Sequence, residues 1–182
     1  MLPEISKFLS NPINLVVLGW LGLYLFFVFL VFFYKYFSLS AWIKKEEKAL
    51  DTLLNTDMFP IESALKPCME KAVSVNKYTF DACIQAVKKK STSGLTFLGI
   101  VASTSPFIGL FGTVIGILSA FAGMQSVTTI NMIAPAIADA LIATAVGILT
   151  AVPAYSFHQI LAKKVEDLLA TLKMQRDVYL SK

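Results

Sequence analysis

Residues 99–123 read GIVASTSPFIGLFGTVIGILSAFAG, and residues 133–157 read IAPAIADALIATAVGILTAVPAYSF. Each stretch has the roughly 20 consecutive, mostly apolar residues that a helix needs to cross the hydrocarbon core of a bilayer. From Ser91 to Ala162 the chain contains no Lys, Arg or Glu, and Asp139 is the one acidic residue. These two stretches therefore predict two transmembrane helices, the second of which carries a single carboxylate.

A third apolar stretch, Ile13–Phe33, predicts another span near the N-terminus. It has no small-residue cleavage motif and lysines follow it, so we expect a retained anchor rather than a cleaved signal peptide. Hydrophobic residues make up 56% of the 182 positions and charged residues 15%, which argues against an ordinary soluble domain. The predicted fold class is an all-α membrane protein with three transmembrane helices.

The basic residues predict the orientation in the membrane. Ten lysines lie between Leu30 and Thr92 and five Lys or Arg follow His158, whereas the turn at 125–132 has none. Because cytoplasmic loops are enriched in Lys and Arg, we expect a periplasmic N-terminus, a cytoplasmic loop and a cytoplasmic C-terminus. The net charge of +4 reflects this topology, and the interleaving of lysines with acidic residues argues against nucleic-acid binding.

We expect four parts along the chain: an N-terminal segment with the first span (1–37), a cytoplasmic helical loop (38–93), the second and third spans (94–157) and a cytoplasmic C-terminal helix (158–182). Within the loop, residues recurring at steps of four and three from Met69 to Val87, with Asn76 among them, predict one helix. A similar series predicts a single helix from about Ala134 to Tyr179, packed against the loop helices or against neighbouring copies.

These segments contain cysteine and histidine, two residue types that can take part in redox chemistry or metal binding. Cys68 and Cys83 lie in the loop, where thiols stay reduced, and they lack metal-ligand spacing, so we expect buried small side chains rather than redox chemistry. His158 lies on the apolar series of the last helix, where we expect a structural role.

Small residues recur at helical spacing in both predicted spans. They are Gly109, Gly112 and Gly116 in the second span and Ala140 and Gly147 in the third. Such residues let helix backbones approach closely in lipid, where association depends on packing and interhelical hydrogen bonds. We therefore expect both spans to pack against other helices, and the bulky first span to face the lipid.

Pro106 and Pro153 each fall inside a predicted span, so we expect two helix kinks. A proline removes one backbone hydrogen bond, and hydroxyls such as those of Ser103 or Thr150 can satisfy the freed carbonyl.

Three polar side chains are candidates for moving a proton: Thr113, Thr144 and Asp139. A hydroxyl both donates and accepts hydrogen bonds, so two threonines beside a narrow gap could relay a proton that a carboxylate exchanges. A charged group at bilayer depth usually faces a bundle interior or a water path. The alternatives are a threonine bonded to its own helix and a carboxylate that only accepts interhelical hydrogen bonds.

Enzymatic motifs are absent from the sequence. An intramembrane aspartyl protease needs two carboxylates and only one lies in the spans, and no nucleophile elbow, phosphate loop, zinc motif or dinucleotide fingerprint occurs. We therefore expect no enzymatic activity, no cofactor and no metal.

The stretches SPFIGLFGTVIGI (105–117), APAIADALIATAVG (134–147) and AVPA (151–154) closely resemble the ExbB/TolQ family of proton-channel subunits, distant relatives of the flagellar stator protein MotA. The resemblance implies a homopentamer in the inner membrane of a Gram-negative bacterium. It also implies that the second and third spans line a pore around the single transmembrane helices of two ExbD- or TolR-like partners. Proton flow would then drive rotation.

The resemblance assigns the residues in turn. Thr113 and Thr144 match the family's pore threonines, whereas Asp139 stands where the family usually has Glu. It implies that an Asp on the partner helix is the main proton carrier and that a TonB- or TolA-like protein uses the output. The motifs favour a TolQ-type subunit of envelope maintenance and division slightly over an ExbB-type subunit of outer-membrane uptake. A passive membrane scaffold and a transporter are the rivals from other classes.

Overall fold

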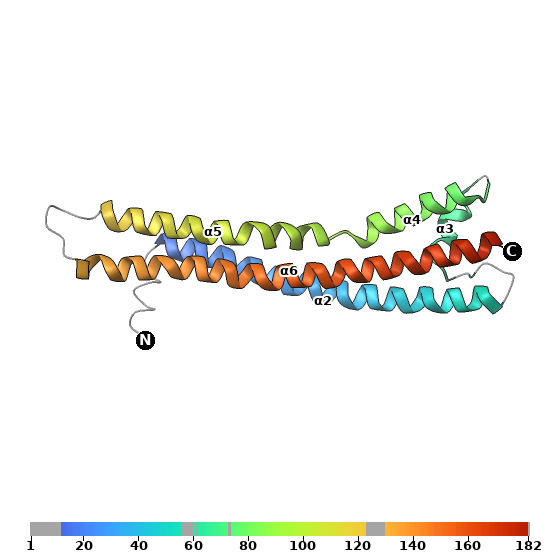
Figure 1. Ribbon diagram of the computed structural model, residues 1–182, viewed down its shortest axis with the longest axis horizontal. Helices are drawn as coiled ribbons and strands as arrows, with labels where there is room; N and C mark the ends of the chain where they lie inside the picture. Colours follow the sequence, from blue (N-terminus) through green and yellow to red (C-terminus); the bar gives the residue numbers. More distant parts are fainter. Residues whose placement is uncertain (1–11, 56–59, 61, 73, 123–129, 182) are drawn as a thin grey trace. The chain divides into compact units, whose positions relative to one another are not determined.

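The structure is a computed structural model that describes residues 12–55, 60, 62–72, 74–122 and 130–181. The elements of these residues are all helices: α2 (Pro12–Asn55), α3 (Lys66–Met69), α4 (Lys77–Ser91), α5 (Leu95–Ala122) and α6 (Ile130–Ser181) (Figure 1). The turn predicted at 125–132 lies mostly outside the described residues. Helices α2, α5 and α6 are each long and apolar enough to cross a membrane, so all three predicted spans lie in helices of suitable length and composition.

Helix α6 is continuous from Ile130 to Ser181, as the series from Ala134 to Tyr179 predicts. The series is buried in its C-terminal half, where the side chains with little or no exposure are Leu161, Val165, Leu168, Leu172 and Gln175. An apolar series at this spacing buries one face of this part of the helix.

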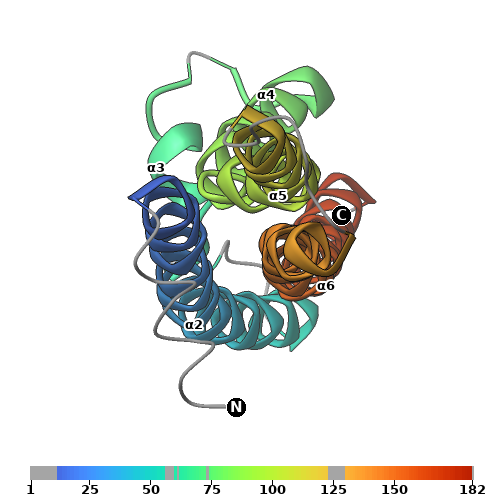
Figure 2. The same cartoon turned by 90° about the vertical axis from the view of Figure 1, so that its left-hand side faces the viewer.

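The described chain forms two compact units. Of the described residues, the first unit comprises 12–30, 97–122 and 130–157, and the second comprises 31–55, 60, 62–72, 74–96 and 158–181. In the first unit Val17 and Leu21 of α2 form a buried cluster with Ala143 of α6. Figure 2, which looks along the helices, shows α5 and α6 side by side.

The outward face of α2 in the first unit carries large apolar side chains. Trp20 is 53% exposed and Phe26 is 64% exposed. Exposed aromatic and aliphatic groups on a helix of membrane length suit contact with lipid tails.

The second unit packs the C-terminal parts of α2 and α6 with α3 and α4. Phe80 of α4 is fully buried and its ring lies 5.6 Å from that of Tyr179 on α6. Lys164 of α6 donates a hydrogen bond of 2.8 Å to the hydroxyl of Ser40 on α2. Of the two packing partners left open for the last helix, the loop helices of the same chain are therefore present.

The predicted loop helix from Met69 to Val87 is wrong in its first half. Helix α3 ends at Met69 and α4 begins at Lys77, because Asn76 caps the N-terminus of α4. The Asn76 side chain accepts a hydrogen bond of 3.0 Å from the Thr79 backbone N–H, in an extended conformation at the capping residue. A residue read as a polar member of a helical face is instead the residue at which the helix starts.

The expectation of two separate thiols is also wrong. Cys68 and Cys83 form a disulfide, with Cα atoms 5.7 Å apart, that joins α3 to α4. The break at Asn76 lets the chain turn back, so that two cysteines 15 residues apart come together.

Pro106 lies inside α5 and Pro153 lies inside α6. Neither of the two hydroxyls named for compensation, those of Ser103 and Thr150, bonds to a carbonyl freed by proline in the part of the chain that the structure describes. Ser103 donates to the Ile100 carbonyl at 3.0 Å and Thr150 donates to the Val146 carbonyl at 2.9 Å, rather than to the carbonyls that the prolines leave free. The kinks themselves stay a prediction.

Candidate functional site

The contact between α5 and α6 in the first unit is made by backbone and small side chains. A Cβ added to Gly109 would lie 2.7 Å from the Ala143 carbonyl oxygen, and one added to Gly147 would lie 2.6 Å from the Ser105 carbonyl oxygen. A Cβ added to Gly116 would lie 2.9 Å from the Cβ of Ala140. The glycines therefore let the two apolar helices approach more closely than larger residues allow.

Thr113 lies in this close contact. It is 7% exposed, and its hydroxyl has the Gly109 carbonyl at 3.1 Å on its own helix and the Ala140 carbonyl at 3.4 Å on α6. The Thr113 hydroxyl also forms a short hydrogen bond with the hydroxyl of Thr144. The structure thus brings together two of the three sequence-predicted residues, from α5 and α6.

The two hydroxyls can be arranged in two ways. When Thr113 donates its single proton to a backbone carbonyl, Thr144 donates to Thr113; when Thr113 donates to Thr144, the Thr144 proton points elsewhere. Thr113 is buried while Thr144 is half-buried, so the second arrangement places the free proton on the more exposed of the two hydroxyls. This is the reorientation that a hydroxyl relay requires.

Asp139 lies on α6 but is not joined to the threonine pair. Its position five residues before Thr144 places the two side chains about 140° apart around the helix, given 100° per residue. Asp139 is half-buried, and none of the residues that the structure describes forms a hydrogen bond or ion pair with it. A carboxylate at membrane depth needs water or another chain to stabilise its charge.

A buried polar cluster in the second unit was missed by the sequence analysis. The Glu46 carboxylate of α2 is fully buried and accepts hydrogen bonds from the Ala64 backbone N–H at 2.8 Å and from the Gln175 side-chain amide of α6 at 3.1 Å. The Ser63 hydroxyl lies 3.0 Å from the same carboxylate and 2.8 Å from the Gln175 carbonyl oxygen. This cluster, Glu46–Ser63–Gln175, ties three segments of the chain together.

An ion-pair group lies near the end of α6. Arg176 pairs with Asp81 of α4 and donates a hydrogen bond of 2.8 Å to Asp177. The hydrogen bond from Arg176 holds the pKa of the Asp177 carboxyl below its ordinary value. The Arg176 side chain is thus a charged link between α4 and α6.

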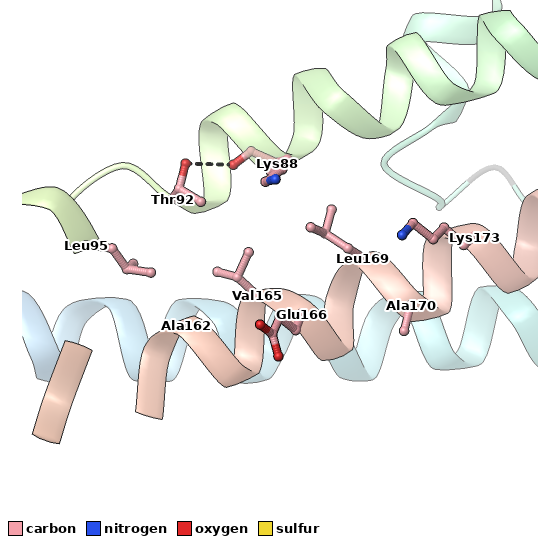
Figure 3. Close-up of a pocket in the computed structure, with 9 residues that line it drawn as sticks. All are labelled: Lys88, Thr92, Leu95, Ala162, Val165, Glu166, Leu169, Ala170 and Lys173. Atoms are coloured by element: carbon pink, nitrogen blue, oxygen red, sulfur yellow. Dashed lines mark hydrogen bonds between the residues drawn. The ribbon is translucent and has the colours of Figure 1, made fainter. Parts of the chain in front are cut away.

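A cavity of about 430 Å³ lies in the second unit, between the α4–α5 junction and α6 (Figure 3). Its wall carries the apolar side chains Leu95, Val165 and Leu169, and charged Lys88 and Lys173 also line it. It contains none of the candidate proton-path residues. Among the residues described, no group of three or more His, Cys, Asp or Glu could hold a metal ion.

Three membrane-length apolar helices and a partly buried hydroxyl pair between two of them define a multi-span membrane protein with a polar site inside an apolar contact. The sequence profile of the MotA/TolQ/ExbB proton channel family matches residues 61–174, so the chain belongs to this family. This membership, with the three apolar helices, makes it a multi-pass protein of the inner membrane.

Named relatives fall in two branches of the family. The chain is 40% identical to the biopolymer transport protein ExbB-like 1 of Helicobacter pylori over 188 aligned positions, covering 100% of both chains. It is 41% identical to the ExbB protein of Salmonella typhimurium over 91 residues, 49% of this chain and 37% of that one. It is 49% identical to the Tol-Pal system protein TolQ of Pseudomonas aeruginosa over 73 residues, 39% of this chain and 32% of that one.

Proposed function

We propose that the chain is a pore-lining subunit of a motor driven by the proton gradient across the inner membrane. The observation that carries this proposal is the Thr113–Thr144 hydroxyl pair, partly buried in the apolar α5–α6 contact of a proton channel family member. A hydroxyl pair with two donor arrangements suits stepwise proton transfer, whereas a contact built only for packing needs no such pair.

The pair needs a proton acceptor from outside this chain. On the Thr113 side it ends on backbone carbonyls, which are poor proton acceptors, and Asp139 points to another side of α6. The same proposal therefore includes a homopentamer around the single-span helices of an ExbD- or TolR-like partner, which supplies a carboxylate. Asp139, without a partner among the described residues, would be stabilised at a subunit or partner contact.

The orientation belongs to the same proposal. With the N-terminus in the periplasm, the lysine-rich segment 38–93 and the residues after His158 lie in the cytoplasm, in agreement with the distribution of Lys and Arg. Residues 94–157 then form the pore part.

For the output of the motor we propose the ExbB type, which energises uptake across the outer membrane through a TonB-like protein. The full-length similarity to an ExbB-like protein supports this choice. The TolQ type, which acts through a TolA-like protein in envelope maintenance and division, is the second candidate. It is supported by the 49% identity to a TolQ protein over part of the chain.

The test is complementation of a deletion strain with the partner gene intact, comparing Asp139→Asn and Thr144→Ala with Asp139→Glu and Thr144→Ser as conservative controls. Iron-limited growth reports the ExbB type, and resistance to bile salts together with normal cell separation reports the TolQ type. We expect Asp139→Asn and Thr144→Ala to lose one of these two phenotypes, either growth under iron limitation or bile-salt resistance with normal cell separation. We expect both control variants to retain it. Full activity of both test variants at normal protein level would sink the channel proposal and favour a passive scaffold.

A further inference from the structure

The Cys68–Cys83 disulfide connects a very short helix to a long one. Helix α3 has four residues and no side-chain cap, whereas α4 has 15 residues and three lysines in its last turn. A single helical turn is not stable by itself in water, because the free-energy cost of nucleating a helix exceeds the stabilisation that one turn of hydrogen bonds provides. The position of α3 therefore depends on its tertiary contacts.

Two kinds of contact hold the segment that contains α3. At its start, Ser63 and Ala64 bond to the buried carboxylate of Glu46, and the Leu65 side chain is fully buried. Further along, the disulfide at Cys68 attaches it covalently to α4. Opening the disulfide would leave only non-covalent contacts, namely the polar ones at the start and the buried side chains of Leu65 and Met69.

The two cysteines differ in exposure. Cys83 is 1% exposed, while Cys68 is half-buried and thus the residue that a reagent reaches more readily. Exchange requires attack by a thiolate on an accessible sulfur of the disulfide. Attack at the more exposed Cys68 therefore makes the buried Cys83 the leaving thiolate.

The role inferred for this disulfide depends on the compartment in which it lies. This step rests on the cytoplasmic orientation proposed above. In the cytoplasm thiols are kept reduced, so cytosolic disulfides are usually transient and catalytic or redox-sensing. We propose that Cys68 and Cys83 form a reversible redox site, opened by a dithiol reductant and closed by a low-molecular-weight disulfide, that controls how firmly residues 63–72 are attached to α4.

The proposed thiol–disulfide exchange needs no reagent other than the dithiol reductant for opening and the small disulfide for closing. A reductant thiolate attacks the Cys68 sulfur, the Cys68–Cys83 bond breaks, and Cys83 leaves as a thiolate that takes up a proton. The second thiol of the reductant then attacks the mixed disulfide and releases Cys68, so two electrons and two protons pass to the cysteines and the reductant leaves as a disulfide. Closure is the reverse exchange with a small disulfide, which leaves as two thiols.

The first arm of the test measures thiol state in intact cells of the host, using the full chain. Cells are quenched with acid before and after treatment with the thiol oxidant diamide, and free thiols are counted by a mass-tagged maleimide. We expect two free thiols before treatment and an intramolecular disulfide within minutes after it. Thiols that stay free after diamide, or a disulfide already complete in untreated cells, would overturn the inference.

The second arm measures the structural effect on purified protein in detergent. Limited proteolysis of residues 63–72 is compared for the oxidised protein, the protein reduced with dithiothreitol and the Cys68→Ser/Cys83→Ser variant. We expect cleavage to be about tenfold faster in the latter two, a conservative share of the loop-closure effect for a loop of this length. Equal cleavage of all three forms would overturn the proposed control of attachment.

A third arm separates this inference from the proposed function. In the Cys68→Ser/Cys83→Ser background, the exposed Ser74 is replaced in Ser74→Cys, and intact cells receive a membrane-impermeant maleimide. Labelling only after the inner membrane is disrupted supports the cytoplasmic orientation. The first two arms then decide the redox inference by themselves. Labelling of intact cells whose outer membrane is permeable to the reagent would place the loop outside and overturn both the orientation and the redox site.

Discussion

The hydroxyls of Thr113 and Thr144 are hydrogen-bonded to each other across the contact between α5 and α6. The Thr113 hydroxyl also has a backbone carbonyl of its own helix within reach, and Thr144 is half-buried. The interhelical bond distinguishes this pair from the other hydroxyls of α5, such as Thr104, which bonds the Ile100 carbonyl of its own helix at 2.8 Å. A threonine that only satisfies its own helix has no need of a partner on the next one.

Replacing Thr113 by Val tests the pair with little change in shape. Thr113→Val removes the hydroxyl and leaves Thr144 without its interhelical partner, at a stability cost of about 1 kcal/mol. We expect gradient-dependent complementation to fall to the level of the deletion strain, while Thr113→Ser retains it. Thr104→Val is the matched control, and equal activity of Thr113→Val and Thr104→Val at equal protein level would contradict the relay.

The glycines of the same contact give a stability prediction. Gly147→Ala places a methyl group against the Ser105 carbonyl oxygen, at a distance of 2.6 Å before any adjustment. We expect a loss of roughly 1–3 kcal/mol, as for overpacked interiors. The measurement is thermal unfolding in detergent by circular dichroism.

The control for this substitution is Gly22→Ala on α2, where nothing lies within 4 Å of the added Cβ. Alanine favours a helix over glycine by about 1 kcal/mol, so Gly22→Ala is expected to be neutral or stabilising. If Gly147→Ala proves as stable as Gly22→Ala, the two helices are not held at the distance described here.

Glu46 gives a prediction for the second unit. Glu46→Ala leaves the buried Ala64 N–H without its acceptor, and an unsatisfied buried group costs on the order of 1–3 kcal/mol. Ser63 and Gln175 each lose one hydrogen bond to the carboxylate but keep the bond to each other. We expect a lower midpoint of chemical unfolding and faster proteolysis near Ser63. The exposed neighbour in Glu47→Ala is the control, and equal midpoints for both variants would refute the role of the cluster.

Arg176 gives a pH prediction. Because its hydrogen bond lowers the pKa of Asp177, this carboxylate contributes stability above its ordinary pKa of 3.8, and the contribution is lost as the pH falls through the lower pKa of the folded state. In Arg176→Gln we expect Asp177 to titrate closer to its ordinary value. A carbon-detected NMR titration of the carboxyl group checks this, and an unchanged midpoint would show that Arg176 is not the cause.

The spans and the α5–α6 contact were largely predictable, because small residues at helical spacing in an apolar stretch have one physical use in lipid. That Gly109 packs on Ala143 of the same chain was not predictable, because the spacing of small residues does not indicate which helix they contact. The break at Asn76 was missed because a capping residue and a polar residue on a helical face look alike at one position. The disulfide depends on that break, so it was missed as well.

Glu46 is one of the acidic residues interleaved with the lysines of segment 38–93, and its burial was not predicted. A signal was present: Leu39, Glu46, Ala49 and Leu53 follow each other at steps of seven, three and four, which puts Glu46 on the buried face of α2. Gln175 stands likewise on the buried series of α6. A polar residue on each of two facing series indicates a buried hydrogen bond, but only after the two helices are known to be neighbours.

The glycine contact also limits how this protein can change over generations. No amino acid is smaller than glycine, so at Gly109 and Gly147 every mutation adds atoms and none removes them. Sequence drift at these positions can therefore push α5 and α6 apart but cannot draw them together. The separation of the two threonine-bearing helices is already at the lower limit that the genetic code permits, and selection can only preserve it or relax it.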